Sequence, residues 1–391
     1  MTVLANARVV TPRRVLEPGW LRVEDGRIAA LGAGDPETVP PARAVDLGGA
    51  WVLPGFVDIH VHGGGGAAYT SGDPDDARAA AAFHRAHGTT TTVASLVTAG
   101  LDDLERAVRA LAPLVGERVL AGLHLEGPYL SPSHAGAHDP ALLRSPDPRE
   151  LGRLLDAAGG TVRMVTVAPE LRGGLELVRR TVAAGAVAAV GHTDATYDEA
   201  RAAFDAGARV ATHLYNAMRS LHHREPGLVA AALEDERVTV ELIADGVHVH
   251  DAVAALAFGA AGPARTALIT DAMAAAGMAD GAYELGPMDV RVRDGVARLA
   301  GGGSIAGSTL TMDAALRRAV RALGVPIVDA ARAASTTPAR LLGLRTGALE
   351  PGLDADLVVL GDELAVSSVM VRGTWATGSP PAEAGRAHVM H

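Results

Sequence analysis

The sequence predicts an α/β protein: a (β/α)8 TIM-type barrel with a small β-sandwich domain formed from both chain termini. Across residues 54–344, short runs rich in valine, isoleucine and threonine are each followed by a loop and an alanine-, leucine- and arginine-rich helix pattern. Apolar strands separated by helices are typical of a parallel sheet covered by helices. The eight candidate strands begin at Val57, Thr89, Val119, Arg163, Ala186, Ala208, Thr239 and Ala264.

The two ends of the chain have a different pattern. Near the start, VLANARVV and WLRVEDGRIAALGAG have the composition of strands, and Asp25-Gly26 is a typical hairpin turn. Near the end, GLDADLVVLGDELAVSSVMVRGTWATG predicts two or three more strands. We therefore expect residues 1–53 and 345–391 to form one small β-domain, and residues 54–344 to form the barrel.

The composition is that of a globular protein, with 48% hydrophobic and 20% charged residues among 391. A net charge of -10 without long charged runs indicates neither a nucleic-acid nor a membrane partner. No apolar stretch reaches the roughly 20 residues that span a bilayer, and the first residues do not resemble a signal peptide. The chain has no cysteine, so these features together favour a cytoplasmic protein.

The chain also contains no lysine, so all 35 basic residues are arginine. This absence excludes a Schiff-base lysine, a pyridoxal-phosphate lysine and a P-loop lysine. It also excludes a carboxylated lysine as a metal ligand. A lysine-dependent aldolase barrel is therefore not a candidate.

Polar side chains repeatedly end the apolar runs. His60 and His62 lie in VDIHVHG, where a spacing of two places both imidazoles on one face of a strand. Either could alone be a hydrogen-bonded core histidine. The carboxyl ends of barrel strands form one rim, however, so we expect these groups to converge. The others at this rim are Glu126, His192, His213, Asp245 with His248, and Asp271.

Four histidines and two carboxylates at one rim indicate a metal site. A ligand set of nitrogen and oxygen without sulfur suits a divalent Zn, Fe, Mn or Co ion. An open site of this kind activates water and polarises a carbonyl. The sequence therefore predicts a hydrolase.

Several motifs resemble the amidohydrolase superfamily: PGFVDIHVHG, GHTDA, THLYNAM, ITDAM and GLDADLVVL. Others are similar to the family of N-acetylglucosamine-6-phosphate deacetylases within it: GLHLEGPYLSP, GHTDATYDEA, HREPG, ADGVHVH, TDAMAAAG and GSIAGSTLTMD. The resemblance covers nearly the whole chain. It implies a metal-dependent barrel enzyme with one or two metal ions per subunit, and a homodimer. Whether a neighbouring subunit completes the phosphate site is left open by the sequence.

The resemblance also implies roles for individual residues. Glu126, His192 and His213 would hold the principal metal, with Glu126 at the place where related enzymes use a carboxylated lysine. Asp271 would be the general base and acid. Family members do not all share His60 and His62. Because this chain has both, the resemblance implies a second metal site, with Glu126 bridging the two metals and Asp271 near the second.

Substrate contacts follow from the same motifs. His138 would hold or polarise the acetamide carbonyl, and the remaining substrate-binding residues would be Ala137, Asn216, Ala217, Arg224, His248, Ile305, Ala306 and Gly307. The implied reaction converts N-acetyl-D-glucosamine 6-phosphate to D-glucosamine 6-phosphate and acetate. Two alternatives stay open: an amidohydrolase for another N-acetyl sugar phosphate such as N-acetylgalactosamine 6-phosphate, and a non-catalytic sugar-phosphate binder.

Overall fold

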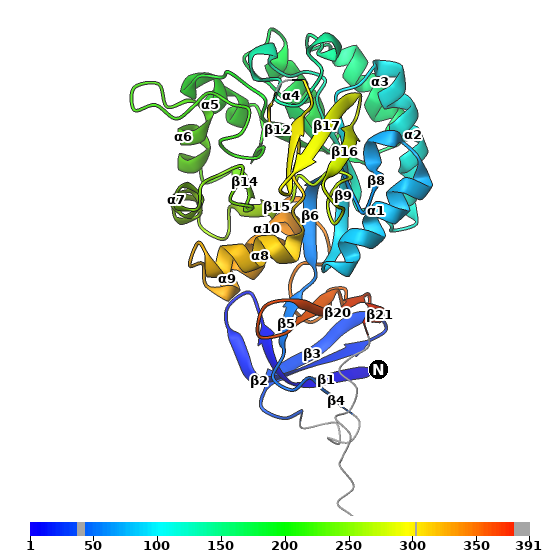
Figure 1. The fold of residues 1–391 in the computed structure, drawn as a ribbon. Coiled ribbons are helices and arrows are strands. Elements are labelled where there is room, and N and C mark those ends of the chain that lie inside the picture. Colours follow the sequence, from blue (N-terminus) through cyan, green and yellow to red (C-terminus); the bar gives the residue numbers. More distant parts are fainter. Residues whose placement is uncertain (37–43, 302, 379–391) are drawn as a thin grey trace, which may run out of the picture. The chain divides into compact units, whose positions relative to one another are not determined.

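A computed structural model describes residues 1–36, 44–301 and 303–378. Its central feature is an eight-stranded parallel sheet in the order β15-β14-β13-β12-β11-β10-β9-β6 (Figure 1). All eight predicted strands are present, which confirms the predicted barrel. The strands are β6 (Phe56–Val61), β9 (Thr89–Val97), β10 (Gly122–Glu126), β11 (Val162–Val167), β12 (Val187–Val190), β13 (Val210–Ala211), β14 (Thr239–Ile243) and β15 (Thr266–Ile269).

One helix of the barrel follows each strand. The strands are almost entirely buried because side chains on one face fill the barrel interior and those on the other pack against these helices. The helices are α1 (Pro74–Ala86), α2 (Leu101–Gly116), α3 (Pro148–Ala158), α4 (Gly174–Ala183), α5 (Tyr197–Asp205), α6 (Gly227–Glu234), α7 (Asp251–Ala261) and α8 (Met312–Arg321).

The barrel closes between its first and last strands, β6 and β15. The backbone N–H of Asp271 donates to the carbonyl of His60 at 2.9 Å, and the N–H of His62 donates to the carbonyl of Ala272 at 2.7 Å. In the interior, the hydroxyl of Thr270 donates to the buried carboxyl of Asp58 at 2.5 Å. These bonds bring His60 of β6 next to Asp271, which lies just beyond β15, although the two metal-ligand candidates are far apart in the sequence.

Both ends of the chain contribute to a second sheet, as predicted. Its order is β21-β20-β19-β5-β1-β2-β3, with β4 paired to β1, and its core includes Leu4, Leu21, Val52 and Leu357. The strands are β1 (Thr2–Val10), β2 (Val15–Glu24), β3 (Arg27–Ala33), β4 (Val45–Asp46), β5 (Trp51–Pro54), β19 (Leu357–Leu360), β20 (Val366–Val371) and β21 (Thr374–Thr377).

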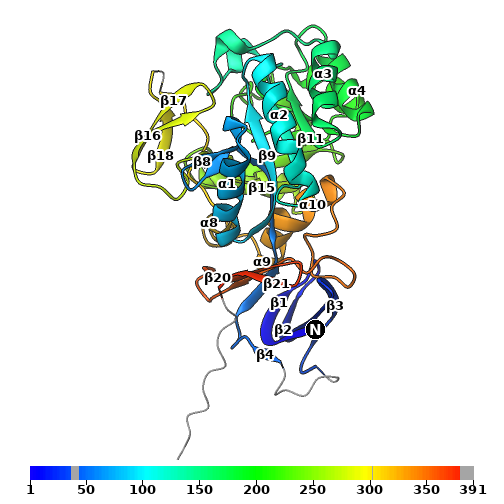
Figure 2. The same ribbon diagram turned by 90° about the vertical axis from the view of Figure 1, so that its right-hand side faces the viewer.

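A three-stranded antiparallel sheet between β15 and α8 was not predicted. It comprises β16 (Gly281–Leu285), β17 (Met288–Arg293) and β18 (Val296–Leu299), drawn in yellow in Figure 2. Its two tight turns, Gly286-Pro287 and Asp294-Gly295, contain residues with positive φ, and Asp-Gly is a common hairpin turn. The insertion matters for the site because Leu285 and Val290 pack with Val97 of β9.

The chain divides into two compact units. One contains the described residues of Met1–Val57, His84–Thr90 and Val325–His391, including α9 (Ile327–Ala331) and α10 (Thr337–Leu341). The other contains Asp58–Phe83 and the described part of Thr91–Gly324. The domain limits expected from the sequence, at 53/54 and 344/345, stay a prediction. Among the residues that the structure describes, no helix is long and apolar enough to cross a membrane.

We predict that Arg265 stabilises the barrel unit, because its guanidinium donates to five carbonyl oxygens. They belong to Ala232, Leu233, Asp235, Val238 and Ala260, at 2.8–3.3 Å, and several are helix-end carbonyls without a helical partner.

Arg265→Met should lower the free energy of unfolding by about 2 kcal/mol, as measured by urea denaturation. The matched control is Arg106→Met, because Arg106 is 72% exposed and its ion pair is with Asp103; it should cost less than about 0.5 kcal/mol. Equal effects of the two substitutions would contradict the prediction.

Candidate metal centre

Six predicted ligands converge at the carboxyl end of the barrel. His60 lies within β6, His62 directly follows it, and Glu126 is the last residue of β10. His192, His213 and Asp271 each lie two residues beyond their strands, with left-handed φ of 47°, 28° and 50°. All six side chains are buried. The left-handed turn at three strand ends directs those side chains over the barrel mouth instead of continuing the strand.

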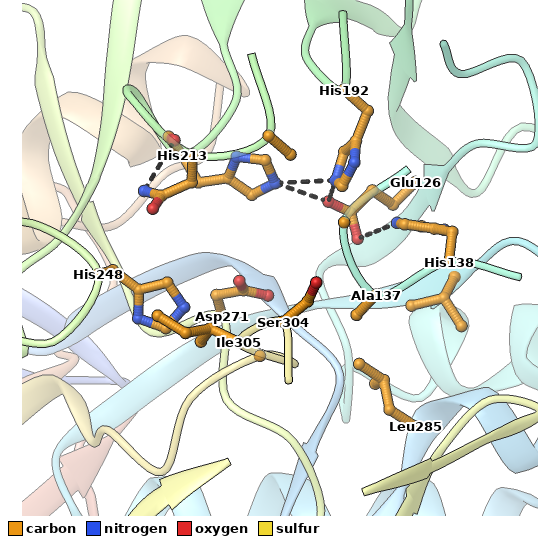
Figure 3. Close-up of a pocket in the computed structure, with 15 residues that line it drawn as sticks. Glu126, Ala137, His138, His192, His213, His248, Asp271, Leu285, Ser304 and Ile305 are labelled. Atoms are coloured by element: carbon orange, nitrogen blue, oxygen red, sulfur yellow. Dashed lines mark hydrogen bonds and ion pairs between the residues drawn. The ribbon is translucent and has the colours of Figure 1, made fainter. Parts of the chain in front are cut away.

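Glu126, His192 and His213 form one group of candidate ligands. Oε1 of Glu126 lies 3.1 Å from Nε2 of His192 and 3.0 Å from Nε2 of His213, and the two nitrogens are 3.0 Å apart. Figure 3 shows the three groups pointing toward one another at the edge of a cavity.

His60, His62 and Asp271 form a second group. Oδ1 of Asp271 lies 3.6 Å from Nε2 of His60 and 3.1 Å from Nε2 of His62. Glu126 contacts this group as well: its Oε1 is 3.3 Å from His60 Nε2, and its Oε2 is 3.2 Å from His62 Nε2. The carboxylate of Glu126 therefore lies between two groups of three ligands.

These distances fit divalent metal ions. Metal–ligand bonds of about 2.1 Å in a tetrahedral arrangement place neighbouring ligand atoms roughly 3.4 Å apart, close to the separations found here. Nε2 of His60 is buried and has no hydrogen-bond partner among the described residues, although two carboxylate oxygens face it. The chemistry of the donors and their spacing thus suit one ion in each group.

The site is strongly polarised by its own charges. Burial would raise the pKa of Glu126 and of Asp271, but the neighbouring histidines hold both pKa values well below the usual range. Burial would lower the pKa of His62, but Asp271 and Glu126 raise it to about 9. Protons on His60 and His62 thus balance the carboxylates in the metal-free protein, and a bound cation would replace those protons.

Contacts behind the histidines fix their orientation. Nδ1 of His60 contacts the carboxylate of Glu241 at 3.0 Å. Nδ1 of His62 and of His192 face backbone carbonyls, those of Ser95 at 3.2 Å and His134 at 2.9 Å. Glu241 was not predicted as a site residue. The one indication in the sequence is an acidic residue inside the apolar run TVELI.

His138 is arranged as a neutral hydrogen-bond donor. The backbone N–H of Thr98 donates to its Nδ1 at 3.2 Å, so the ring proton belongs on Nε2, which lies 3.6 Å from Oε2 of Glu126. Burial lowers the pKa of His138 to about 4. The imidazole can therefore donate to an oxygen that is bound beside Glu126.

A cavity of about 270 Å³ opens over the two groups. It is lined by residues that the sequence singled out and by residues that it did not (Figure 3). The predicted residues are Glu126, Ala137, His138, His192, His213, Asn216, Ala217, His248, Asp271, Ile305 and Gly307; the unpredicted ones are Val97, Gly136, Leu285 and Ser304. Leu285 comes from the unpredicted three-stranded sheet.

Two residues expected to contact substrate lie outside this lining. Ala306 is fully buried between Ile305 and Gly307 and packs with the three-stranded sheet. Arg224 is exposed, and its guanidinium contacts Nε2 of His223 at 2.7 Å. The guanidinium of Arg224 is therefore not part of the described wall of this cavity.

Other histidines and the glycines that follow VDIHVH have local structural roles. The ring of His134 contacts Asp194 at 3.1 Å, and the ring of His250 caps the N-terminus of α7 by accepting from the backbone of Ala252. Residues 63–64 form β7 (Gly63–Gly64), which pairs with β8 (Ala67–Ala68). None of these groups belongs to the two ligand sets.

Comparison with known proteins gives a consistent assignment. The amidohydrolase family model matches residues 51–376. The N-acetylgalactosamine-6-phosphate deacetylase of Escherichia coli O157:H7 is 41% identical over 96% of this chain and 99% of its own. The N-acetylglucosamine-6-phosphate deacetylase of Bacillus subtilis is 35% identical over 97% and 98%.

A solved structure is similar over the same extent. It is an Asp-to-Ala variant of the N-acetyl-D-glucosamine-6-phosphate deacetylase of Mycobacterium smegmatis, in complex with N-acetyl-D-glucosamine-6-phosphate. Its identity to this chain is 53% and the TM-score is 0.93, with coverage of 96% of this chain and 99% of that one. On the family match and on these relatives, the chain belongs to the amidohydrolase family.

Proposed function

We propose that this protein hydrolyses the acetamide of N-acetyl-D-glucosamine 6-phosphate to D-glucosamine 6-phosphate and acetate. The observation that carries the proposal is the carboxylate of Glu126, which lies between two groups of metal ligands at the wall of a cavity. Relatives that match nearly the whole chain are deacetylases of N-acetyl amino-sugar phosphates. A non-catalytic binder is not favoured, because the six predicted ligands converge in two groups, and four of them line the cavity together with His138.

The metal cofactor would be held by the chain's own histidines and carboxylates. Glu126, His192 and His213 would hold the principal ion, and His60, His62 and Asp271 a second. A divalent ion supplies Lewis acidity and lowers the pKa of water at such a site. Zn, Fe, Mn and Co all suit these ligands.

Asp271 would transfer the proton. In the metal-free protein the charges of His60 and His62 keep its carboxylate ionised in spite of burial. A bound cation would supply that positive charge in their place, so Asp271 can accept a proton from the attacking water. Water oxygen then bonds to the acetamide carbon, and the carbon–nitrogen bond breaks as Asp271 donates that proton to the nitrogen. The products are acetate and the free amine.

His138 would stabilise the charge that develops on the acetamide oxygen. Its Nδ1 accepts from Thr98, which leaves Nε2–H to donate into the cavity. A neutral donor of this kind stabilises an oxyanion without holding a competing charge in the ground state.

The sugar phosphate would lie toward the other side of the cavity. Asn216, Ala217 and His248 line that side, and Nδ1 of His248 contacts Asp245 at 2.7 Å, so its Nε2 is left for the substrate. We propose that Ile305 and Gly307 line the same pocket, with Ala306 supporting them from below. The exposed Arg224 would reach the phosphate site of a neighbouring subunit in a homodimer, which we propose to be cytoplasmic.

The relatives differ in the sugar that their names give. The relative that is 41% identical acts on the galactosamine derivative, whereas the solved structure at 53% identity contains the glucosamine derivative. We favour the glucosamine derivative. N-acetylgalactosamine 6-phosphate is the alternative, because it differs in the configuration of a single hydroxyl.

The substrate is tested by acetate release from the metal-loaded protein. We expect the highest kcat/KM with N-acetyl-D-glucosamine 6-phosphate, a lower value with the galactosamine epimer, and a loss of at least tenfold without the phosphate, because its ionic contacts would be missing. A higher kcat/KM with the galactosamine epimer would change the proposed substrate but not the proposed reaction. Binding without metal-dependent acetate release would overturn the proposed activity.

Asp271→Asn should lower kcat by several orders of magnitude, because the amide cannot carry the proton between water and the nitrogen. The asparagine oxygen still allows ligation, so metal content measured by elemental analysis should stay largely intact. Near-normal turnover in this variant would refute the role of Asp271.

His138→Gln should lower kcat by about 100-fold to 1000-fold, the usual effect of losing an oxyanion donor. KM should change little if the contact strengthens mainly in the transition state. The control is His134→Gln, because the ring of His134 contacts Asp194 outside the cavity lining. If both variants lose the same activity, the role assigned to His138 is wrong.

A further inference from the structure

Glu241 is a fully buried carboxylate that belongs to neither group of metal ligands. It is the third residue of β14 and is 0% exposed. Its Oε2 is 3.0 Å from Nδ1 of His60 and accepts the backbone N–H of His213 at 3.1 Å. Its Oε1 is buried and has no hydrogen-bond partner among the described residues.

Such a carboxylate is unfavourable for stability alone. A buried charge with an unsatisfied oxygen costs free energy that an apolar side chain of similar size would not. Glu241 also interrupts an apolar strand whose other four residues are all buried. A reason for a carboxylate at this position is therefore sought in its effect on His60 and His213, the two residues that it contacts.

The contact with Glu241 fixes the protonation of His60. Oε2 accepts the backbone N–H of His213, and because a carboxylate has no proton to donate, it accepts from His60 as well, so one ring proton is on Nδ1. Nε2 is then the nitrogen that a cation would bind in exchange for a proton; it has no hydrogen-bond partner among the described residues and lies 3.3 Å from Glu126 Oε1. The imidazole of His60 is thus oriented for a cation before one binds.

His60 differs in this respect from the other three histidines. Nδ1 of His62 and of His192 face neutral backbone carbonyls, and Nδ1 of His213 has no partner among the described residues. A carboxylate behind an imidazole makes the opposite nitrogen a better ligand than a carbonyl does. The ligand strength of His60 therefore depends on Glu241 more than that of the other histidines depends on their partners.

We propose that Glu241 is a positioning residue that controls the affinity for the second metal ion. It orients His60, adds negative charge behind the group His60, His62 and Asp271, and holds the backbone of His213 in the other group. Binding of the two ions is thereby linked through one carboxylate. The inference rests on the metal centre of the proposed function but not on the identity of the substrate.

The test is a metal titration of the metal-free protein with Zn²⁺, in competition with a chromophoric chelator. The wild type should bind two ions per chain, and His62→Asn, which removes a ligand of the second group, identifies the step that belongs to that group. In Glu241→Gln this same step should weaken by about 10-fold to 100-fold, while the other step changes by only a few-fold. The visible spectrum of the Co²⁺ form should lose the contribution of the second ion at equal metal concentration.

The control separates positioning from general stability. Asp235→Asn alters another buried carboxylate of the same unit, which pairs with Arg237 at 2.6 Å; both metal affinities should stay as in the wild type. The melting temperature of metal-free Glu241→Gln should lie within a few degrees of the wild-type value.

Three results would overturn the proposal. The wild type could bind a single ion, or Glu241→Gln could leave both metal affinities unchanged. The third is that Glu241→Gln lowers both metal affinities and also greatly lowers the melting temperature of the metal-free protein. The titration uses no sugar phosphate. Failure of the acetate-release assay would therefore count against the proposed activity and leave the inference about Glu241 standing.

Discussion

The site depends on one electrostatic constraint, the burial of the Glu126 carboxylate. A buried negative charge must be paired, and here five imidazoles surround it: those of His60, His62, His138, His192 and His213. They come from β6, from the loop after β10 and from the ends of β12 and β13. A parallel barrel meets this demand because the carboxyl ends of its strands share one rim.

Three of the ligands occupy strained backbone positions, which ties the fold to the site. His192, His213 and Asp271 have positive φ without being glycine, at a cost on the order of 1 kcal/mol each. The surroundings hold them there. The N–H of Asp271 donates to His60, the N–H of His213 donates to Glu241, and the carbonyl of His192 accepts from Ser131. The hydrogen bonds that hold these three turns are made with other strands and loops of the barrel. The positions of the three candidate ligands therefore depend on the closure of the barrel.

The sequence was sufficient to predict the eight strands and the convergence of six polar side chains, because both follow a local pattern of apolar runs that end in a polar residue. The role of these six residues as metal ligands stays a prediction. Glu241 was missed because nothing local distinguishes a carboxylate that contacts His60 from an unpaired one; the partner is 181 residues away. The strands β16, β17 and β18 were missed because they are short and half exposed. The position of Leu285 in the cavity wall was therefore not predicted. The exposed position of Arg224 depends on a loop conformation that no periodicity encodes.

Charge balance then explains why this centre requires a cation. Glu126, Asp271 and Glu241 bring three carboxylates together, and the described lining of the cavity contains no arginine. In the metal-free protein the charges are offset by protons, since nearby carboxylates raise the pKa of both His60 and His62 against the effect of burial. Protons and metal ions therefore compete for the same nitrogens, and metal binding must release protons. Because the chain has no lysine to carboxylate, the group that contacts both ligand sets is the carboxylate of Glu126. On the roles proposed above, the number of bound ions would depend on His60 and His62 and on Glu241 behind them.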